Sequence, residues 1–186
     1  MSHVIDYWEV KLRHEVSQLP SLQFFKAEFC SLASPHPILW TPRADPYEVS
    51  KAVIQLRMLS GRYRTSVLTK HWSSDRTGSC PAPDCTDQET IEHFLVICSF
   101  YNQYRAKLKK LWQDTKTPIL NDLVTAVLTY PSHDLLQFIL DASVHPLMIS
   151  YVQTYGNELL PEVFHLTRTW CYTLHQARLK LLKLRV

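Results

Sequence analysis

The chain of 186 residues has little glycine and no long apolar run. It contains three glycines against eleven prolines, which favours helices with abrupt breaks over hairpin-rich β-structure. No stretch approaches the roughly 20 consecutive apolar residues of a membrane-spanning helix. There is also no large excess of one charge, because the net charge is only +3. Such a mild balance permits nucleic-acid binding but does not demand it.

Two kinds of catalytic pattern are missing as well. The sequence has no pair of adjacent aspartates in an apolar strand setting, which the two-metal centre of a polymerase needs. Zinc deaminases place His-x-Glu before Pro-Cys-x-x-Cys, whereas here the cysteines come before the histidine. No nuclease motif is recognisable either. The sequence therefore predicts a protein that is not an enzyme.

Cysteine is sparse, and its number is odd. Five cysteines without a recognisable signal peptide favour a reducing compartment and metal binding over disulfides. We expect an intracellular protein, nuclear or cytoplasmic.

Four metal-ligand side chains fall within nineteen residues: Cys80, Cys85, His93 and Cys98. Their order is Cys-x4-Cys-x7-His-x4-Cys, and Cys₃His sets commonly bind tetrahedral zinc. Four protein ligands close the coordination shell, whereas catalytic zinc keeps one position open. The alternatives are buried packing cysteines or a disulfide between Cys80 and Cys85. We predict one structural zinc ion.

The local sequence around these ligands indicates a turn followed by a short helix. Pro81 and Pro83 stiffen the first cysteine pair into a turn, because proline fixes φ. Thr90 is a candidate N-cap for the apolar run that follows. The separation of His93 from Cys98 is too wide for one ideal helical turn, so we expect the helix to tighten or end before Cys98.

The apolar periodicity predicts a mostly α fold, an irregular helical domain with a small Cys₃His zinc-knuckle-like insertion. We divide the chain into N-terminal amphipathic helices (1–34), a proline-rich linker (35–46), a helix plus the zinc-knuckle-like module (47–115) and a C-terminal helical segment (116–186). Asp45, Pro46 and Glu48 form a strong helix start. Short helices are predicted at 120–128, 134–142 and 146–155.

The last predicted helix runs from Val163 and has an apolar stripe that includes Trp170 and Leu174. Core packing is the default interpretation of this stripe, and docking onto another protein is the alternative. The helix also carries basic residues without balancing acids, a pattern that favours a positive face holding nucleic acid or another part of a larger protein. These are Arg168, Arg178, Lys180, Lys183 and Arg185.

Two basic stretches with interspersed aromatic residues are candidates for nucleic-acid contact. Arginine and lysine bind phosphates, and aromatic rings stack on bases. The alternative for both stretches is a charged surface that only contacts solvent. The candidates are Arg57, Arg62, Tyr63, Arg64, Lys70 and Trp72 before the cysteines, and Arg105, Lys107, Lys109 and Lys110 after them.

Three stretches together resemble the C-terminal region of LINE-type (non-LTR) retrotransposon reverse-transcriptase polyproteins. The first is the leucine–glycine–basic segment 56–65. The second is the metal motif, in which residues 90–95 match a threonine–x–glutamate–histidine–apolar pattern. The third comprises 137–141 and 164–172. The order of the three makes the resemblance more specific than the short motif alone. Many relatives have two residues between the first cysteines, where this chain has four.

The resemblance implies a zinc-knuckle-like region that lies downstream of the polymerase and helps hold template RNA or target DNA. It transfers only the ligand roles of Cys80, Cys85, His93 and Cys98. Because the polymerase carboxylates are missing, we expect a truncated or separately encoded remnant that does not polymerise. The alternative function is a zinc-stabilised scaffold that docks onto a reverse transcriptase or another copy of the chain, without nucleic-acid contact and without a membrane role.

Overall fold

The computed structural model describes residues 2–19, 22, 24–26, 36–39, 45–70, 77–115 and 117–183. They form mostly helices, so the prediction of a mostly helical fold is confirmed. The elements are α1 (Ser2–Ser17), η3 (Pro37–Leu39), α2 (Pro46–Leu59), α3 (Ser66–Thr69), η4 (His93–Ile97), η5 (Ser99–Tyr101), α4 (Asn102–Gln113), α5 (Pro118–Leu128), α6 (Ser132–Leu140), η6 (Ala142–Val144), α7 (Pro146–Tyr155), η7 (Asn157–Leu159) and α8 (Leu160–Lys183). Over the described ranges, β-structure is limited to an antiparallel bridge between Ser79 and Gln88.

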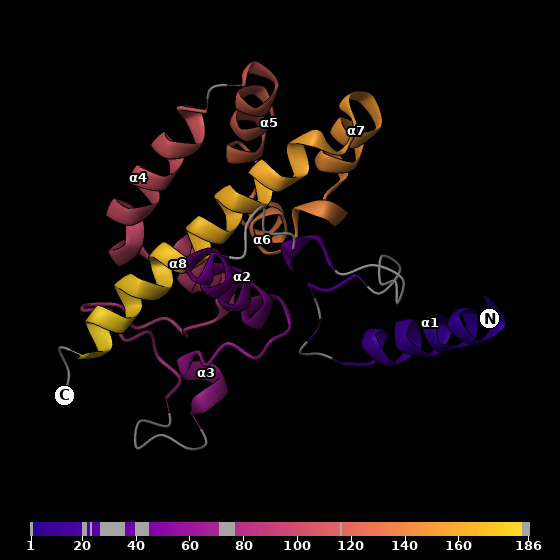
Figure 1. The fold of residues 1–186 in the computed structure, drawn as a ribbon. Coiled ribbons are helices and arrows are strands. Elements are labelled where there is room, and N and C mark those ends of the chain that lie inside the picture. Colours follow the sequence, from indigo (N-terminus) through magenta and orange to yellow (C-terminus); the bar gives the residue numbers. More distant parts are fainter. Residues whose placement is uncertain are drawn as a thin grey trace.

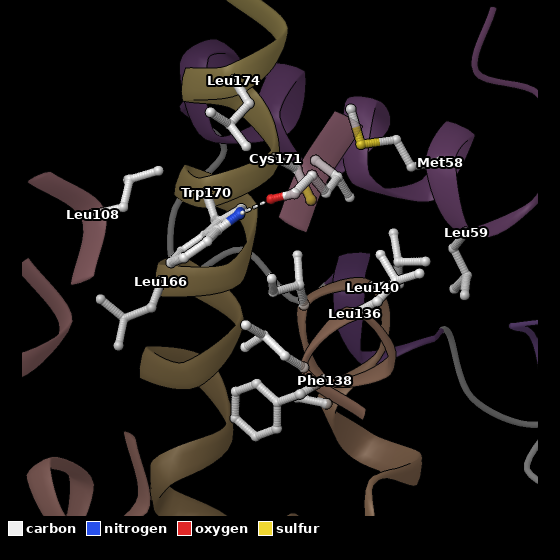
Figure 2. Packing of buried hydrophobic residues seen from close by; sticks show 14 of the residues in the cluster. Met58, Leu59, Leu108, Leu136, Phe138, Leu140, Leu166, Trp170, Cys171 and Leu174 are labelled. Atoms are coloured by element: carbon white, nitrogen blue, oxygen red, sulfur yellow. Dashed lines mark hydrogen bonds between the residues drawn. The ribbon is translucent and has the colours of Figure 1, made fainter. Parts of the chain in front are cut away.

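Helix α8, with 24 residues, is the element on which α2, α4 and α6 pack. It crosses the molecule as the long yellow helix of Figure 1, in contact with α2, α4 and α6. Trp170 and Leu174 of the predicted stripe are fully buried, so the stripe is core. Figure 2 shows Trp170 among side chains of α4, α6 and α8, with its indole Nε1 donating a hydrogen bond. The acceptor is the Leu95 carbonyl, at 3.3 Å.

Helix α2 begins where the sequence predicts it. The Asp45 carboxylate accepts a hydrogen bond from the Tyr47 amide at 2.9 Å, and Pro46 occupies the first helical position. A buried polar contact then fixes α2 against α6 and α8. Gln55 Nε2 donates to the Ile139 carbonyl at 2.7 Å and lies 3.0 Å from Thr167 Oγ1.

One hydrophobic core draws on both of the predicted segments 47–115 and 116–186. The predicted linker at 35–46 contributes to it where the structure describes that segment. Ile38 is fully buried, and its carbonyl accepts a hydrogen bond from Arg168 Nη1 of α8 at 3.0 Å. Within residues 36–39, Ile38 is therefore packed into the core, whereas Leu39 is exposed.

Helix α1 stands apart from the other helices in Figure 1. It occupies the first part of the predicted N-terminal helical region, and the rest of that region lies largely outside the described residues. Tyr7, Trp8 and Val10 on this helix are exposed. In the described part of the chain, no helix combines the length and the apolar character needed to cross a bilayer.

Candidate metal centre and arginine groove

The four predicted metal ligands come together in space. The ligand atoms of Cys80, Cys85, His93 and Cys98 all lie within 4.8 Å of one another. The Cys80 and Cys98 sulfurs are 3.7 Å apart, and the Cys85 sulfur lies 3.3 Å from His93 Nε2. The three cysteines are free thiols, so Cys80 and Cys85 form no disulfide. The cluster is close enough to hold a metal ion.

Cys80 and Cys85 are placed by a short hairpin, residues 78–89, which we call the metal hairpin. Its two sides are joined by the Ser79–Gln88 bridge and by hydrogen bonds from the Cys80 amide to the Asp87 carbonyl (2.8 Å) and from the Glu89 amide to the Gly78 carbonyl (3.0 Å). Between them the chain turns tightly, which brings both thiols to the same place. The predicted turn at Pro81 and Pro83 is thus part of a closed loop.

His93 and Cys98 are placed by a π-helical turn, η4. The Thr90 hydroxyl accepts a hydrogen bond from the His93 amide at 3.0 Å, as the predicted cap requires. The Cys98 amide donates to the His93 carbonyl at 2.7 Å, a bond that spans five residues. The helix ends before Cys98, as expected. Its last turn is a wider π turn, however, and not the tighter turn that was the other expectation. A π turn adds a residue per turn, so the two ligands stay on one side, and such turns are frequent at functional sites.

Burial controls the protonation of the ligands. It raises the pKa of the Cys80 and Cys98 thiols, and it lowers the pKa of His93 although the Asp87 carboxylate opposes this change. A neutral imidazole offers a lone pair to a metal, and a bound cation would supply the positive charge that thiolates need in an apolar site. Asp87 Oδ2 lies 3.7 Å from His93 Nδ1, whereas the other ring nitrogen, Nε2, faces the Cys85 sulfur.

A second feature is an open pocket of about 730 Å³ between α2, α3 and the C-terminal half of α8, which we call the arginine groove. Arg57, Arg62 and Arg64 line it and are exposed. Among the described residues, no carboxylate lies within ion-pairing distance of these three arginines. Its other lining residues are Ile54, Tyr63, Ser66, Thr69, His175, Arg178, Leu179 and Leu182.

The structure separates the ten residues predicted to contact nucleic acid. Arg57, Arg62 and Arg64 share the arginine groove, and Lys70 is half-buried just beyond α3. Lys107, Lys109 and Lys110 are exposed on α4, which contributes no residue to that groove. Trp72 lies outside the described residues.

Two of the ten predicted contacts are turned into the core. Tyr63 is only 5% exposed, stacks on Phe94 at 5.7 Å and bonds to His175 Nδ1 through its hydroxyl at 2.9 Å. Arg105 is 4% exposed and donates to the Cys98 carbonyl and to Asn102 Oδ1. Burial leaves both side chains little surface for a base or a phosphate, although Tyr63 still contributes to the lining of the groove.

A buried ion pair joins the two features and was not foreseen from the sequence. Arg178 donates to Glu89 through Nε (2.6 Å) and Nη2 (2.7 Å), and Glu89 is fully buried. Although burial alone would lower it, the hydrogen bonds and charge of Glu89 raise the pKa of Arg178. Removing one partner of such a pair costs about 3–5 kcal/mol. In the sequence, Arg178 looks like part of a basic face, and Glu89 stands among the acidic residues Asp84, Asp87 and Glu92.

No known protein family, curated protein or solved structure matches this chain. The resemblance to retrotransposon polyproteins therefore stays an expectation from the sequence motifs.

Proposed function

We propose that the chain is a non-catalytic, zinc-stabilised module that binds nucleic acid through the arginine groove. The observation that carries this proposal is the convergence of Arg57, Arg62 and Arg64 on one pocket, without carboxylate partners among the described residues. Guanidinium groups left unpaired around a concavity attract anions, and arginine matches phosphate in a bidentate manner. The role agrees with that of the retrotransposon segment that the motifs resemble.

The ligand geometry supports zinc as the metal. Zinc bonds of about 2.3 Å to sulfur and about 2.0 Å to nitrogen place tetrahedral ligand atoms about 3.8 Å apart for two sulfurs and about 3.5 Å for sulfur and nitrogen. The Cys80–Cys98 and Cys85–His93 separations are 3.7 Å and 3.3 Å, and all four ligand atoms lie within 4.8 Å of one another. Cys80, Cys85, His93 and Cys98 would close the shell, so the ion would tie the metal hairpin to η4 without an open position for chemistry.

The shape of the groove supports a ligand that is both anionic and partly apolar. Ile54, Leu179 and Leu182 provide aliphatic surface beside the arginines. The volume of about 730 Å³ lies within the range of roughly 300–1,000 Å³ typical of pockets that enclose small ligands. A phosphodiester strand offers phosphates for the arginines and sugar or base surface for the aliphatic side chains.

The test is binding of labelled RNA and DNA by the metal-loaded protein over a range of salt concentrations. Wild-type affinity should fall steeply as salt rises, and the combined change of Arg57, Arg62 and Arg64 to Glu should reduce the slope of log affinity against log salt by about 2. The matched control changes Lys107, Lys109 and Lys110 to Glu on α4. No binding at low salt, or equal losses in both triple variants, would contradict the proposed groove.

One observation favours the scaffold function as the second candidate. Tyr7, Trp8 and Val10 are exposed on α1, a surface suited to docking on a reverse transcriptase or another copy of the chain. Trp170 and Leu174 no longer fit that role, because both are fully buried in the core. Under this alternative, Trp8→Ser abolishes assembly measured by size-exclusion chromatography, and the groove variant assembles normally.

A further inference from the structure

We propose that the metal hairpin sets the shape of the arginine groove through Glu89, so that metal occupancy controls anion binding. Glu89 is then a positioning residue, which acts on the ligand through Arg178 and Ser66. This inference rests on the proposed function, since it concerns the regulation of the same groove.

The first link joins the metal to Glu89. Glu89 closes the metal hairpin, because its amide donates to the Gly78 carbonyl at 3.0 Å. Cys80 and Cys85 lie within that hairpin, whereas His93 and Cys98 belong to a turn whose His93, Phe94 and Leu95 are buried. An isolated two-stranded hairpin is marginally stable at best in water. A metal ion bound by all four ligands would therefore hold the hairpin, and Glu89 with it, against the core.

The second link joins Glu89 to the wall of the groove. Glu89 Oε1 accepts from Arg178 Nε at 2.6 Å, and Oε2 accepts from Arg178 Nη2 at 2.7 Å. Oε2 also accepts from the Ser66 amide at 2.6 Å and from the Ser66 hydroxyl at 2.8 Å. Ser66 and Arg178 both line the groove, one from α3 and one from α8. One buried carboxylate thus sets the distance between two walls of the site.

A separate contact supports the same connection. Gly78, at the other end of the metal hairpin, packs so closely on α3 that an added Cβ would lie 3.2 Å from the Val67 Cα. Val67 follows Ser66 directly. Both ends of the metal hairpin therefore contact α3. Glu89 makes a polar contact with Ser66, and Gly78 packs closely on Val67.

The positioning role of Glu89 and its negative charge predict opposite effects of Glu89→Gln on anion binding. Glu89→Gln removes a negative charge beside a cationic groove, so the electric field alone would tighten anion binding. If Glu89 positions the groove, the same change releases Arg178 and Ser66 and weakens binding. Arg178→Lys separates the effects in another way, since it keeps the positive charge but loses the two parallel hydrogen bonds.

The experiment measures fluorescence anisotropy of labelled oligouridine with wild type, Glu89→Gln, Arg178→Lys and the control Glu92→Gln, alongside metal content and circular dichroism. Glu92 belongs to the same segment, but its carboxylate accepts from Ser132 and does not line the groove. We expect Glu89→Gln and Arg178→Lys to bind oligouridine about tenfold more weakly with one metal per chain retained, and Glu92→Gln to match wild type. Chelation of the wild type should have the same effect.

Equal or tighter binding by Glu89→Gln and Arg178→Lys, both folded and metal-loaded, would overturn the inference. If Glu89→Gln does not fold, Arg178→Lys decides alone. Failure of the proposed function has a different signature, because wild-type protein would then not bind oligouridine at low salt. Binding that is lost in the Arg57, Arg62 and Arg64 variant but unchanged in both positioning variants would reject this inference only.

Discussion

His145 shows how a single buried side chain makes stability depend on pH. It is the N-cap of α7, where its Nδ1 accepts a hydrogen bond from the Leu147 amide at 3.3 Å. Burial lowers the pKa of His145, with Lys26 adding to the effect and the Asp134 carboxylate opposing it. The folded protein therefore favours the neutral imidazole that accepts this bond.

The expected consequence is a loss of stability in acid. Because the folded pKa of His145 is lowered, the unfolded chain binds a proton more readily as pH falls below about 6.5, and the free energy of unfolding decreases until the folded form titrates as well. His145→Asn keeps a capping acceptor without a titratable group. Denaturant unfolding at several pH values should show a smaller acid loss in the variant than in wild type. Parallel pH profiles of the two proteins would contradict this role of His145. The four candidate metal ligands are the same in both proteins, so any pH dependence that they add is shared.

At the scale of elements, the metal hairpin depends on a glycine. Gly78 has a φ of +70° and lies against the backbone of Val67. Left-handed backbone costs other residues about 1–2 kcal/mol. A side chain at this position would add a steric conflict with α3.

Gly78→Ala should therefore lower both the stability and the metal affinity of the chain. We expect a loss of at least about 1–2 kcal/mol in unfolding free energy, and weaker metal binding in a competition assay with a chromophoric chelator. Gly156→Ala is the control. It also has a positive φ, of +80°, but open space around it and a place at the end of α7. The control should lose stability without losing metal affinity, and equal affinity losses would show that the hairpin has no special part.

The whole molecule combines a core of long helices with a candidate metal cluster on the metal hairpin and η4. Helices α2, α6 and α8 contact one another directly. Their contacts include the Gln55 bonds to the α6 carbonyls and to Thr167. The four candidate metal ligands lie outside these three helices, on the metal hairpin and the η4 turn, although Cys80 and Cys98 are buried in the same hydrophobic core. Removal of the metal should therefore affect the two regions differently.

Chelation should release one zinc ion per chain and leave most of the helical circular dichroism signal. Hydrogen exchange should accelerate in residues 78–98, whereas the amides of α6 and α8 should remain protected. This outcome follows from the direct packing of the core helices. Cooperative loss of all helices, or unchanged exchange around the ligands, would contradict this division of the molecule.

Short-range chemistry determined the elements and the metal ligands. The Asp45–Pro46 start of α2, the Thr90 cap and the stripe of α8 depend on spacings along the chain, as does the Cys₃His set, and local geometry decides these directly. The π turn between His93 and Cys98 was predicted only as an irregularity. The spacing shows that one turn of an ideal α-helix does not separate the two residues correctly, but it does not show whether the turn becomes tighter or wider.

Only the tertiary structure decided which charged residues face water. Arg178 and Arg168 look in the sequence like two members of one basic face with Lys180 and Lys183, yet both are buried. Arg178 meets Glu89 across 89 positions, and Arg168 meets the Ile38 carbonyl across 130. No local pattern encodes such pairings, since they arise from helix packing. The groove has the same origin, because Arg57, Arg62 and Arg64 line a pocket only together with residues of α8.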